Sequence, residues 1–154
     1  MRDTNRWTRC ARGHRHWGSL GAAGLLLVRR TPSDVELLLQ HRADWVHHGG
    51  TWSVPGGAIH TGETPWQAAL REVAEETDLD LSAAQEIARH VDDHGGWSYT
   101  TIVATVHVPV DLARVTIGEQ QDLAWLDPVT VDTLSLHPGF GDSWPIVRTL
   151  LTAG

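Results

Sequence analysis

Residues 57–79 read GAIHTGETPWQAALREVAEETDL, and this stretch decides how the rest of the chain is interpreted. Thr64 suits the cap of a helix, Pro65 suits the first helical position, and Gln67 completes a capping box with Thr64. The sequence therefore predicts a helix that begins directly after Thr64. Its expected buried stripe follows helical spacing and comprises Trp66, Leu70, Val73, Ala74 and Thr77.

Three carboxylates share another face of this predicted helix. Glu72, Glu75 and Glu76 fall within an arc of about 100°, which we expect to lie opposite the apolar stripe. Like charges at this spacing repel one another, and Arg71 can pair with Glu75 but cannot neutralise all three. Clustered carboxylate oxygens suit Mg²⁺ or Mn²⁺, whereas a tetrahedral zinc site would need His or Cys. The preceding glycines, Gly56 and Gly57, allow backbone carbonyls to approach an ion or a ligand.

The spacing of these residues resembles a known family motif. Gly57, Glu63, Arg71-Glu72 and Glu75-Glu76 match the pattern Gly-x5-Glu-x7-Arg-Glu-U-x-Glu-Glu-x-Gly-U, in which U is a bulky aliphatic residue. This pattern is the Nudix box, and the match occupies residues 57–79. One fixed position differs, because Asp78 stands where the pattern has Gly, and we expect this change to cost a little stability without loss of chemistry.

The resemblance implies an α/β fold in which a mixed β-sheet is sandwiched between helices (α/β/α). The residue pattern agrees with this fold class. A basic segment (residues 1–16) precedes the expected Nudix hydrolase domain (residues 17–154). Within it we expect a strand hairpin at 20–30 and 35–42, a loop at 43–60, strands at 85–93, 97–108 and 123–126, and a final helix at 143–153 with Pro145 in its first turn.

The same resemblance implies roles for the residues of the box. Glu72, Glu75 and Glu76 are the implied ligands of Mg²⁺, with Mn²⁺ as a substitute, and the carbonyl of Gly57 is a further candidate ligand. Glu63 and Arg71 are the implied pair that orients the ligand carboxylates. The general base is left open between a box glutamate such as Glu75 and Glu119 in a later loop. Glu119 could also be another metal ligand or an exposed loop residue.

Nudix hydrolases cleave a nucleoside diphosphate linked to another group, X, by attack of water on a phosphorus. The run from Gln40 to Asp44 resembles the MutT-like branch, which acts on (deoxy)nucleoside triphosphates, and Arg42 would then contact phosphate. A surface role for Arg42 is an equal alternative. The one asparagine of the chain is Asn5, so Asp142 and Ser143 occupy the region where MutT enzymes read the base with Asn.

Other readings of the function remain open. The domain could bind a nucleotide as a non-catalytic sensor, or it could hydrolyse a nucleotide sugar or another NDP-X compound. A formal net charge of −7 argues against a nucleic-acid polymer as a partner. Four tryptophans, although more typical of a core, could stack on a base: Trp52, Trp97, Trp125 and Trp144.

The first thirty residues hold a second possible metal cluster and an apolar run. Cys10, His14 and His16 resemble part of a zinc site whose fourth ligand could be His47 or His48, although we favour an ordered Arg- and His-rich segment. The run at 20–28 is too short to span a membrane and is followed at once by Arg29 and Arg30. We therefore expect a strand there, no membrane partner and a cytoplasmic location. A homodimer is left open.

Overall fold

The computed structural model describes residues 6–45, 47–77, 79–107, 114–117 and 121–152, and its main sheet is mixed, with helices on both faces. The strand order of the sheet is β7-β8-β3-β4-β10-β9, and β3 runs parallel to β8 while its other neighbours run antiparallel. The strand bounds are β3 (Ala22–Arg30), β4 (Val35–Arg42), β7 (Gln85–Asp93), β8 (Ser98–Thr105), β9 (Arg114–Ile117) and β10 (Gln121–Leu126).

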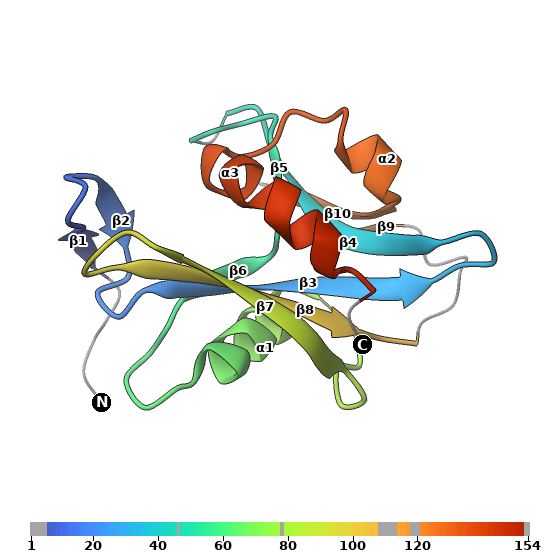
Figure 1. Cartoon of the computed structure of the whole chain (residues 1–154), viewed down its shortest axis with the longest axis horizontal. Coiled ribbons are helices and arrows are strands. Elements are labelled where there is room, and N and C mark those ends of the chain that lie inside the picture. Colours follow the sequence, from blue (N-terminus) through green and yellow to red (C-terminus); the bar gives the residue numbers. More distant parts are fainter. Residues whose placement is uncertain (1–5, 46, 78, 108–113, 118–120, 153–154) are drawn as a thin grey trace.

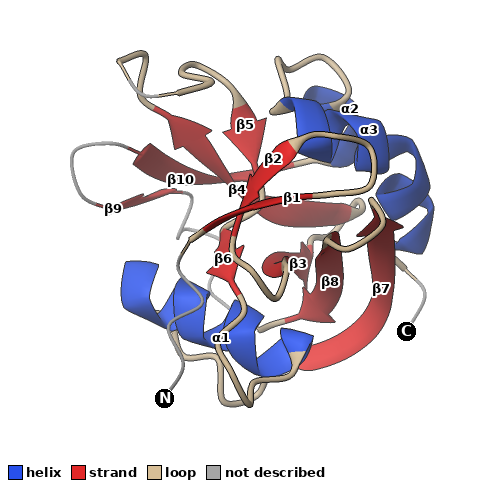
Figure 2. Ribbon diagram, turned by 90° about the vertical axis from the view of Figure 1, so that its left-hand side faces the viewer, coloured by secondary structure: helices blue, strands red, loops and turns tan. Residues whose placement is uncertain are grey.

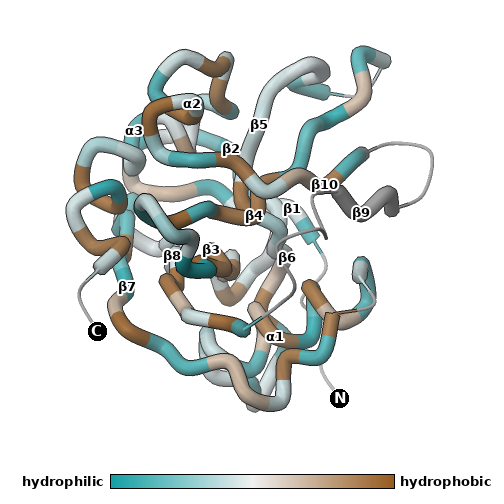
Figure 3. Tube along the Cα trace, turned by 90° about the vertical axis from the view of Figure 1, so that its right-hand side faces the viewer, coloured by the Kyte–Doolittle hydropathy of each residue, from teal (hydrophilic) through white to brown (hydrophobic). Residues whose placement is uncertain are grey.

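The helices cover the sheet from two sides (Figure 1). Helix α1 (Pro65–Glu76) lies on one face, and α2 (Pro128–Val131), α3 (Pro138–Val147) and a 3₁₀ turn (Arg148–Leu150) lie on the other. Successive side chains of β3 point to opposite faces of the sheet. Leu25 packs in the core beneath α1, and Leu26 packs in the core beneath α3. Figure 3 shows hydrophobic residues along the central strands and hydrophilic ones in the outer loops. The predicted α/β/α fold is confirmed.

Helix α1 begins as predicted, with its capping box complete. Thr64 Oγ1 accepts a hydrogen bond from the backbone N–H of Gln67 at 3.1 Å, and Gln67 Oε1 accepts one from the N–H of Thr64 at 3.0 Å. The predicted buried stripe is partly wrong, because Ala74 is exposed while Ala69 and Val73 are fully buried. Compared with the prediction, the face of α1 that packs against the sheet is shifted toward the acidic residues.

That shift changes where the carboxylates lie. Ala69, Val73 and Glu76 stand at i, i+4 and i+7 on one face, so Glu76 faces the sheet together with the apolar residues. The expectation that all three glutamates lie opposite the buried stripe is therefore wrong. Packing against the sheet selects the face, and the small side chains of Ala68 and Ala69 let the helix approach closely.

Several element boundaries also differ from prediction. The expected loop at 43–60 contains β5 (Trp52–Ser53), which pairs with β4, and β6 (Gly56–Ala58), which pairs with β3. The final helix was predicted at 143–153 with Pro145 in its first turn, but α3 begins at Pro138 and Pro145 lies well inside it. Pro138 occupies the first helical position, and His137 Nδ1 accepts a hydrogen bond from the N–H of Gly139 at 3.1 Å, so the helix is capped there instead.

A small hairpin, β1 (Trp7–Arg9) and β2 (Arg15–Trp17), forms a separate two-stranded sheet in front of β3 and β6 (Figure 2). It contacts the turn between β7 and β8, where the N–H of Ala11 donates to the carbonyl of Gly95 at 2.6 Å. The proposed boundary between residues 16 and 17 stays a prediction. None of the helices in the described residues is long and apolar enough to cross a membrane.

Candidate active site

The two glycines that precede α1 are required by close approaches. Strand β6 places Gly56 opposite Gly24 and Gly57 opposite Ala23 in an antiparallel pair with β3. A Cβ atom on Gly56 would clash with the backbone of Ala23, and one on Gly57 would clash with the carboxylate of Glu72. The carboxylate of Glu72 therefore lies directly against the backbone of Gly57. A metal ion bound by both residues would need them to be this close.

Arg71 links the loop, the helix and β6. Its guanidinium donates to both carboxylate oxygens of Glu63, at 2.7 and 3.1 Å, and to the carbonyl of Ala58 at 3.0 Å. Further donations reach Glu72 at 3.0 Å and Glu75 at 3.4 Å. The hydrogen bonds from Arg71 hold the pKa of Glu63 below its usual value, so Glu63 remains charged and keeps the guanidinium in place.

Among the residues that the structure describes, no cation pairs with Glu76 as Arg71 pairs with Glu63. The Oε2 atom of Glu76 is buried and has no hydrogen-bond partner within the described ranges. Burial, and then the charges of Glu72 and Glu75, raise the pKa of Glu76 to about 7. A buried carboxylate oxygen without a partner is costly, so this position calls for a cation that Arg71 does not supply.

The donor set suits a hard divalent cation. Glu72, Glu75 and Glu76 offer carboxylate oxygens, and the backbone of Gly57 lies against the carboxylate of Glu72. Glu75 is the most open of the three, with 57% of its side chain exposed against 17% for Glu72. The residues that the Nudix box implies as ligands therefore fit a magnesium site. Their donors are carboxylate oxygens, and one of these, on Glu76, has no partner among the described residues.

A cleft of about 540 Å³ lies beside Gly56 and Gly57. Arg42, His48 and His137 line one part of it, and Arg42 Nε donates to the carbonyl of His47 at 2.8 Å. Burial, followed by the nearby charges of His48 and Arg42, lowers the pKa of His137 to about 4, so its ring is neutral near pH 7. A volume of this order is typical of small-molecule sites.

The rest of the cleft wall is aromatic and polar. Trp97, Tyr99 and Phe140 contribute aromatic side chains, and Asp142 and Ser143 of α3 lie on the same wall. Burial, and then the charges of Glu76 and Glu72, raise the pKa of Tyr99 far above its usual value, so the phenol stays neutral. The position of Tyr99 near these carboxylates could not be predicted from the sequence, because it depends on the pairing of β8 with β3.

The remaining predicted residues divide into three groups. Trp125 and Trp144 are core residues, whereas Trp52 and Trp97 are half-buried and Trp97 reaches the cleft. Arg42 lines the cleft, as a phosphate contact requires. Two predicted positions, Asp78 and the candidate base Glu119, lie outside the described residues.

A family model described as "NUDIX domain" matches residues 19–150. The chain belongs to this family. A Mycobacterium tuberculosis relative named "Putative 8-oxo-dGTP diphosphatase 3" is 42% identical over 96% of this chain and 70% of that protein. The predicted class of enzyme, a Nudix pyrophosphohydrolase acting on nucleotides, is thereby confirmed.

Solved structures agree with the family assignment. A Nudix hydrolase from M. smegmatis, RenU, is 38% identical and superposes with a TM-score of 0.79 over 94% of this chain and 93% of that one. A MutT structure (Aliivibrio salmonicida or Vibrio cholerae) shares the fold with a TM-score of 0.61 over 88% of this chain and 98% of that one, at 20% identity. Nudix hydrolases generally use divalent metals, in agreement with the donor set.

Proposed function

We propose that this Nudix chain hydrolyses (deoxy)nucleoside triphosphates with Mg²⁺, by attack of water on a phosphorus of the polyphosphate. The observation that carries the proposal is the buried oxygen of Glu76, which has no partner among the described residues. Glu76 is close to the charge of Glu72, whose carboxylate lies against Gly57, a residue that lines the cleft. A folded protein tolerates such a carboxylate where a dication and its polyphosphate arrive together.

The residues of the box have different proposed roles in metal binding, in orienting the ligands and in proton transfer. Glu72, Glu75, Glu76 and the carbonyl of Gly57 would hold Mg²⁺, which when bound neutralises the polyphosphate and acidifies a coordinated water. Arg71 and Glu63 keep the carboxylates of Glu72 and Glu75 oriented. Glu75 remains a candidate base because its side chain is open to solvent, and Glu119 remains the other candidate.

The cleft supports a nucleotide as the substrate. Arg42 offers a guanidinium to phosphate, and the side chains of Trp97 and Phe140 give the cleft wall apolar surface against which a base can pack. The name of the relative, an 8-oxo-dGTP diphosphatase, supports testing an oxidised purine nucleotide as a substrate. Asp142, exposed on the cleft wall, is an acceptor that suits the N–H groups of a guanine.

A panel of purified nucleotides tests this proposal. It should include the common deoxynucleoside and ribonucleoside triphosphates, 8-oxo-dGTP, ADP-ribose and nucleotide sugars, each with Mg²⁺ or with chelator, and products should be separated by chromatography. We expect a triphosphate to be cleaved most efficiently, and Glu76→Gln to abolish cleavage. Arg89→Ala is the matched control, because Arg89 pairs only with surface Glu86 among the contacts described.

Two outcomes would contradict the proposal. Cleavage confined to nucleotide sugars or to ADP-ribose would move the substrate to another NDP-X class. Tight nucleotide binding by a folded protein that releases no product from any compound would instead favour a sensor. Isothermal calorimetry on the same panel separates this second outcome from a protein that does not recognise nucleotides at all.

A further inference from the structure

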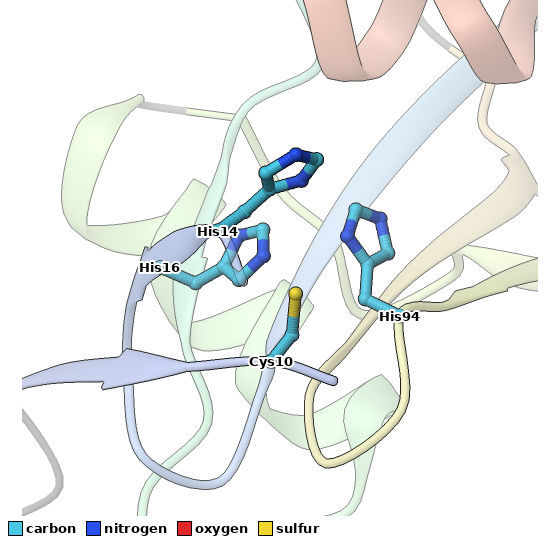
Figure 4. Close-up of side chains that lie close together, drawn as sticks. All are labelled: Cys10, His14, His16 and His94. Carbon is cyan, nitrogen blue, oxygen red and sulfur yellow. The ribbon is translucent and has the colours of Figure 1, made fainter. Parts of the chain in front are cut away.

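A second group of potential metal ligands comprises Cys10 and three histidines that line the cleft, His14, His16 and His94. Each residue offers one ligand atom, and these atoms all lie within 4.8 Å of one another (Figure 4). Cys10 and His14 come from the turn of the β1–β2 hairpin, His16 comes from β2, and His94 comes from the turn between β7 and β8. The fourth donor is thus His94, and neither His47 nor His48.

Two ring nitrogens in this group have unmet hydrogen-bonding capacity. His16 Nε2 and His94 Nδ1 are both buried and find no hydrogen-bond partner among the residues that the structure describes. Buried polar atoms are nearly always paired, so two orphans in one small cluster indicate a missing ligand common to both. Cys10 is 5% exposed, and its sulfur lies between these two rings (Figure 4).

The orphan nitrogens are held in place by their neighbours. His94 Nε2 lies 2.8 Å from Asp92 Oδ2, an arrangement that puts the ring proton on Nε2 and leaves the lone pair of Nδ1 for a metal. His16 stacks on Trp97, with ring centroids 3.8 Å apart and an angle of 6° between the planes. Trp97 is itself fixed by a hydrogen bond from Nε1 to the carbonyl of Gly18. Both donors are therefore oriented before any ion arrives.

The hairpin that carries three of the donors has little else to hold it. A two-stranded hairpin is marginally stable alone, and Trp7 and Trp17 of this one are 57% and 46% exposed. Its attachments to the β7–β8 turn include the contact of Ala11 with Gly95 and a hydrogen bond from Arg12 to the carbonyl of Asp93 at 3.0 Å. The Cys-His group lies at this junction, where a metal would fasten the hairpin to the domain.

We propose that Cys10, His14, His16 and His94 bind one Zn²⁺ ion that fastens the β1–β2 hairpin to the β7–β8 turn. One thiolate and three imidazoles are ligands that Zn²⁺ prefers, and four protein ligands close the tetrahedron, as in sites that stabilise structure. Ligand atoms in such a site stand roughly 3.3–3.6 Å apart, so these donors need to move inward by about 1 Å. The oxygen ligands of the box suit Mg²⁺, so the two sites take different metals.

Metal content tests the site directly. The full chain, purified without a histidine tag and equilibrated with Zn²⁺ against a competing chromophoric chelator, should retain one zinc per chain. We expect Cys10→Ser and His94→Ala each to lower zinc affinity by at least about 100-fold. The matched control is His107→Ala, an exposed histidine outside the cluster, which should leave affinity unchanged. Glu72→Gln should also leave it unchanged, because that residue belongs to the box.

Two further readouts separate metal binding from general damage to the fold. Asp92→Asn keeps the shape of the side chain but weakens its hold on His94, and should lower zinc affinity by about 10–100-fold. Co²⁺ in place of Zn²⁺ should give the absorption bands of a tetrahedral thiolate site in the native chain and lose them in Cys10→Ser. His14→Ala should also weaken zinc binding, because it removes one of the same four donors.

Limited trypsin digestion reports on the hairpin itself. Arg9, Arg12 and Arg15 are exposed cleavage sites there, and the chain has no Lys. Cleavage in the hairpin should become several-fold faster after zinc is removed, whereas in Cys10→Ser it should be fast with or without zinc. Zinc retained by Cys10→Ser, zinc lost through Glu72→Gln instead, or an unchanged affinity in Asp92→Asn would each overturn the proposal.

Discussion

Arg71 holds Glu63 by two hydrogen bonds, at 2.7 and 3.1 Å, so that one guanidinium joins the loop before α1 to the middle of that helix. The same guanidinium reaches the carbonyl of Ala58 at the end of β6. Glu63 therefore acts on the carboxylates through Arg71, which also contacts Glu72 and Glu75. Through this pair, a loop residue that touches no other box glutamate in these contacts can orient the carboxylates proposed to bind the metal.

Replacement of Arg71 by Lys tests this geometry while the charge is kept. An ammonium cannot donate to both oxygens of Glu63 in a planar fork and also reach Glu72, so the carboxylates lose their orientation. We expect kcat to fall by about 10–100-fold and Mg²⁺ affinity to weaken. Steady-state kinetics over a Mg²⁺ titration measures both. Arg89→Lys on the exposed Glu86 pair is the control, and equal kinetics for the two variants would show that the fork is unimportant.

Replacement of Gly57 by Ala tests the contact between β6 and Glu72. The added methyl would occupy the place of the Glu72 carboxylate, so we expect at least about a tenfold loss of Mg²⁺ affinity and of turnover. Gly141→Ala is a matched control, because its Cβ would meet Leu136 at an ordinary 3.6 Å and helix propensity favours Ala. Normal Mg²⁺ binding by folded Gly57→Ala would mean that Glu72 is free to relocate.

Replacement of Arg42 by Ala tests the predicted phosphate contact in the cleft. Loss of one charge-assisted hydrogen bond is worth about 1.5–3 kcal/mol, so KM for a triphosphate should rise about tenfold or more. Arg30→Ala, at the exposed end of β3, removes the same charge elsewhere and should leave KM within about twofold. An unchanged KM in Arg42→Ala would assign this arginine to the surface, which is the other reading of its sequence position.

The sequence predicted local features better than those that depend on packing. The start of α1 was predictable because the capping box involves only neighbouring residues. Strands β4 and β7 matched their predicted bounds because a long apolar run or alternation marks each of them. The two-residue β5 and the glycine-rich β6 carry no such periodicity, and they exist because neighbouring strands pair with them.

The candidate site divides in the same way. The box residues were found by spacing along one helix, which is a local property. The burial of Glu76 was not predictable, because it depends on which face of α1 meets the sheet. His94 could not be joined to Cys10 from sequence either, since two hairpins far apart in the chain bring these donors together. The place of Asp142 on the cleft wall likewise becomes known only once α3 is positioned.

Glu76, whose buried oxygen has no partner among the described residues, should destabilise the metal-free protein although we propose that activity requires it. Because its folded pKa is raised to about 7, the charged form is disfavoured in the folded state. Its cost is absent below the unfolded pKa, grows as pH rises toward 7, and is constant above that. Allowing for partial exposure, we expect Glu76→Gln to raise the free energy of unfolding by about 1–2 kcal/mol at pH 8 and by only a few tenths at pH 5.

Urea unfolding of both proteins in chelator, at pH 5 and pH 8, measures this difference. Chelator removes every bound cation from the two proteins alike, so the comparison isolates the carboxylate. Saturating Mg²⁺ should reverse the order at pH 8, because the dication binds the native carboxylate set and stabilises the wild-type fold by mass action. If Glu76→Gln were less stable than wild type in chelator at pH 8, its carboxylate would have a partner, and the need for a dication at this position would disappear.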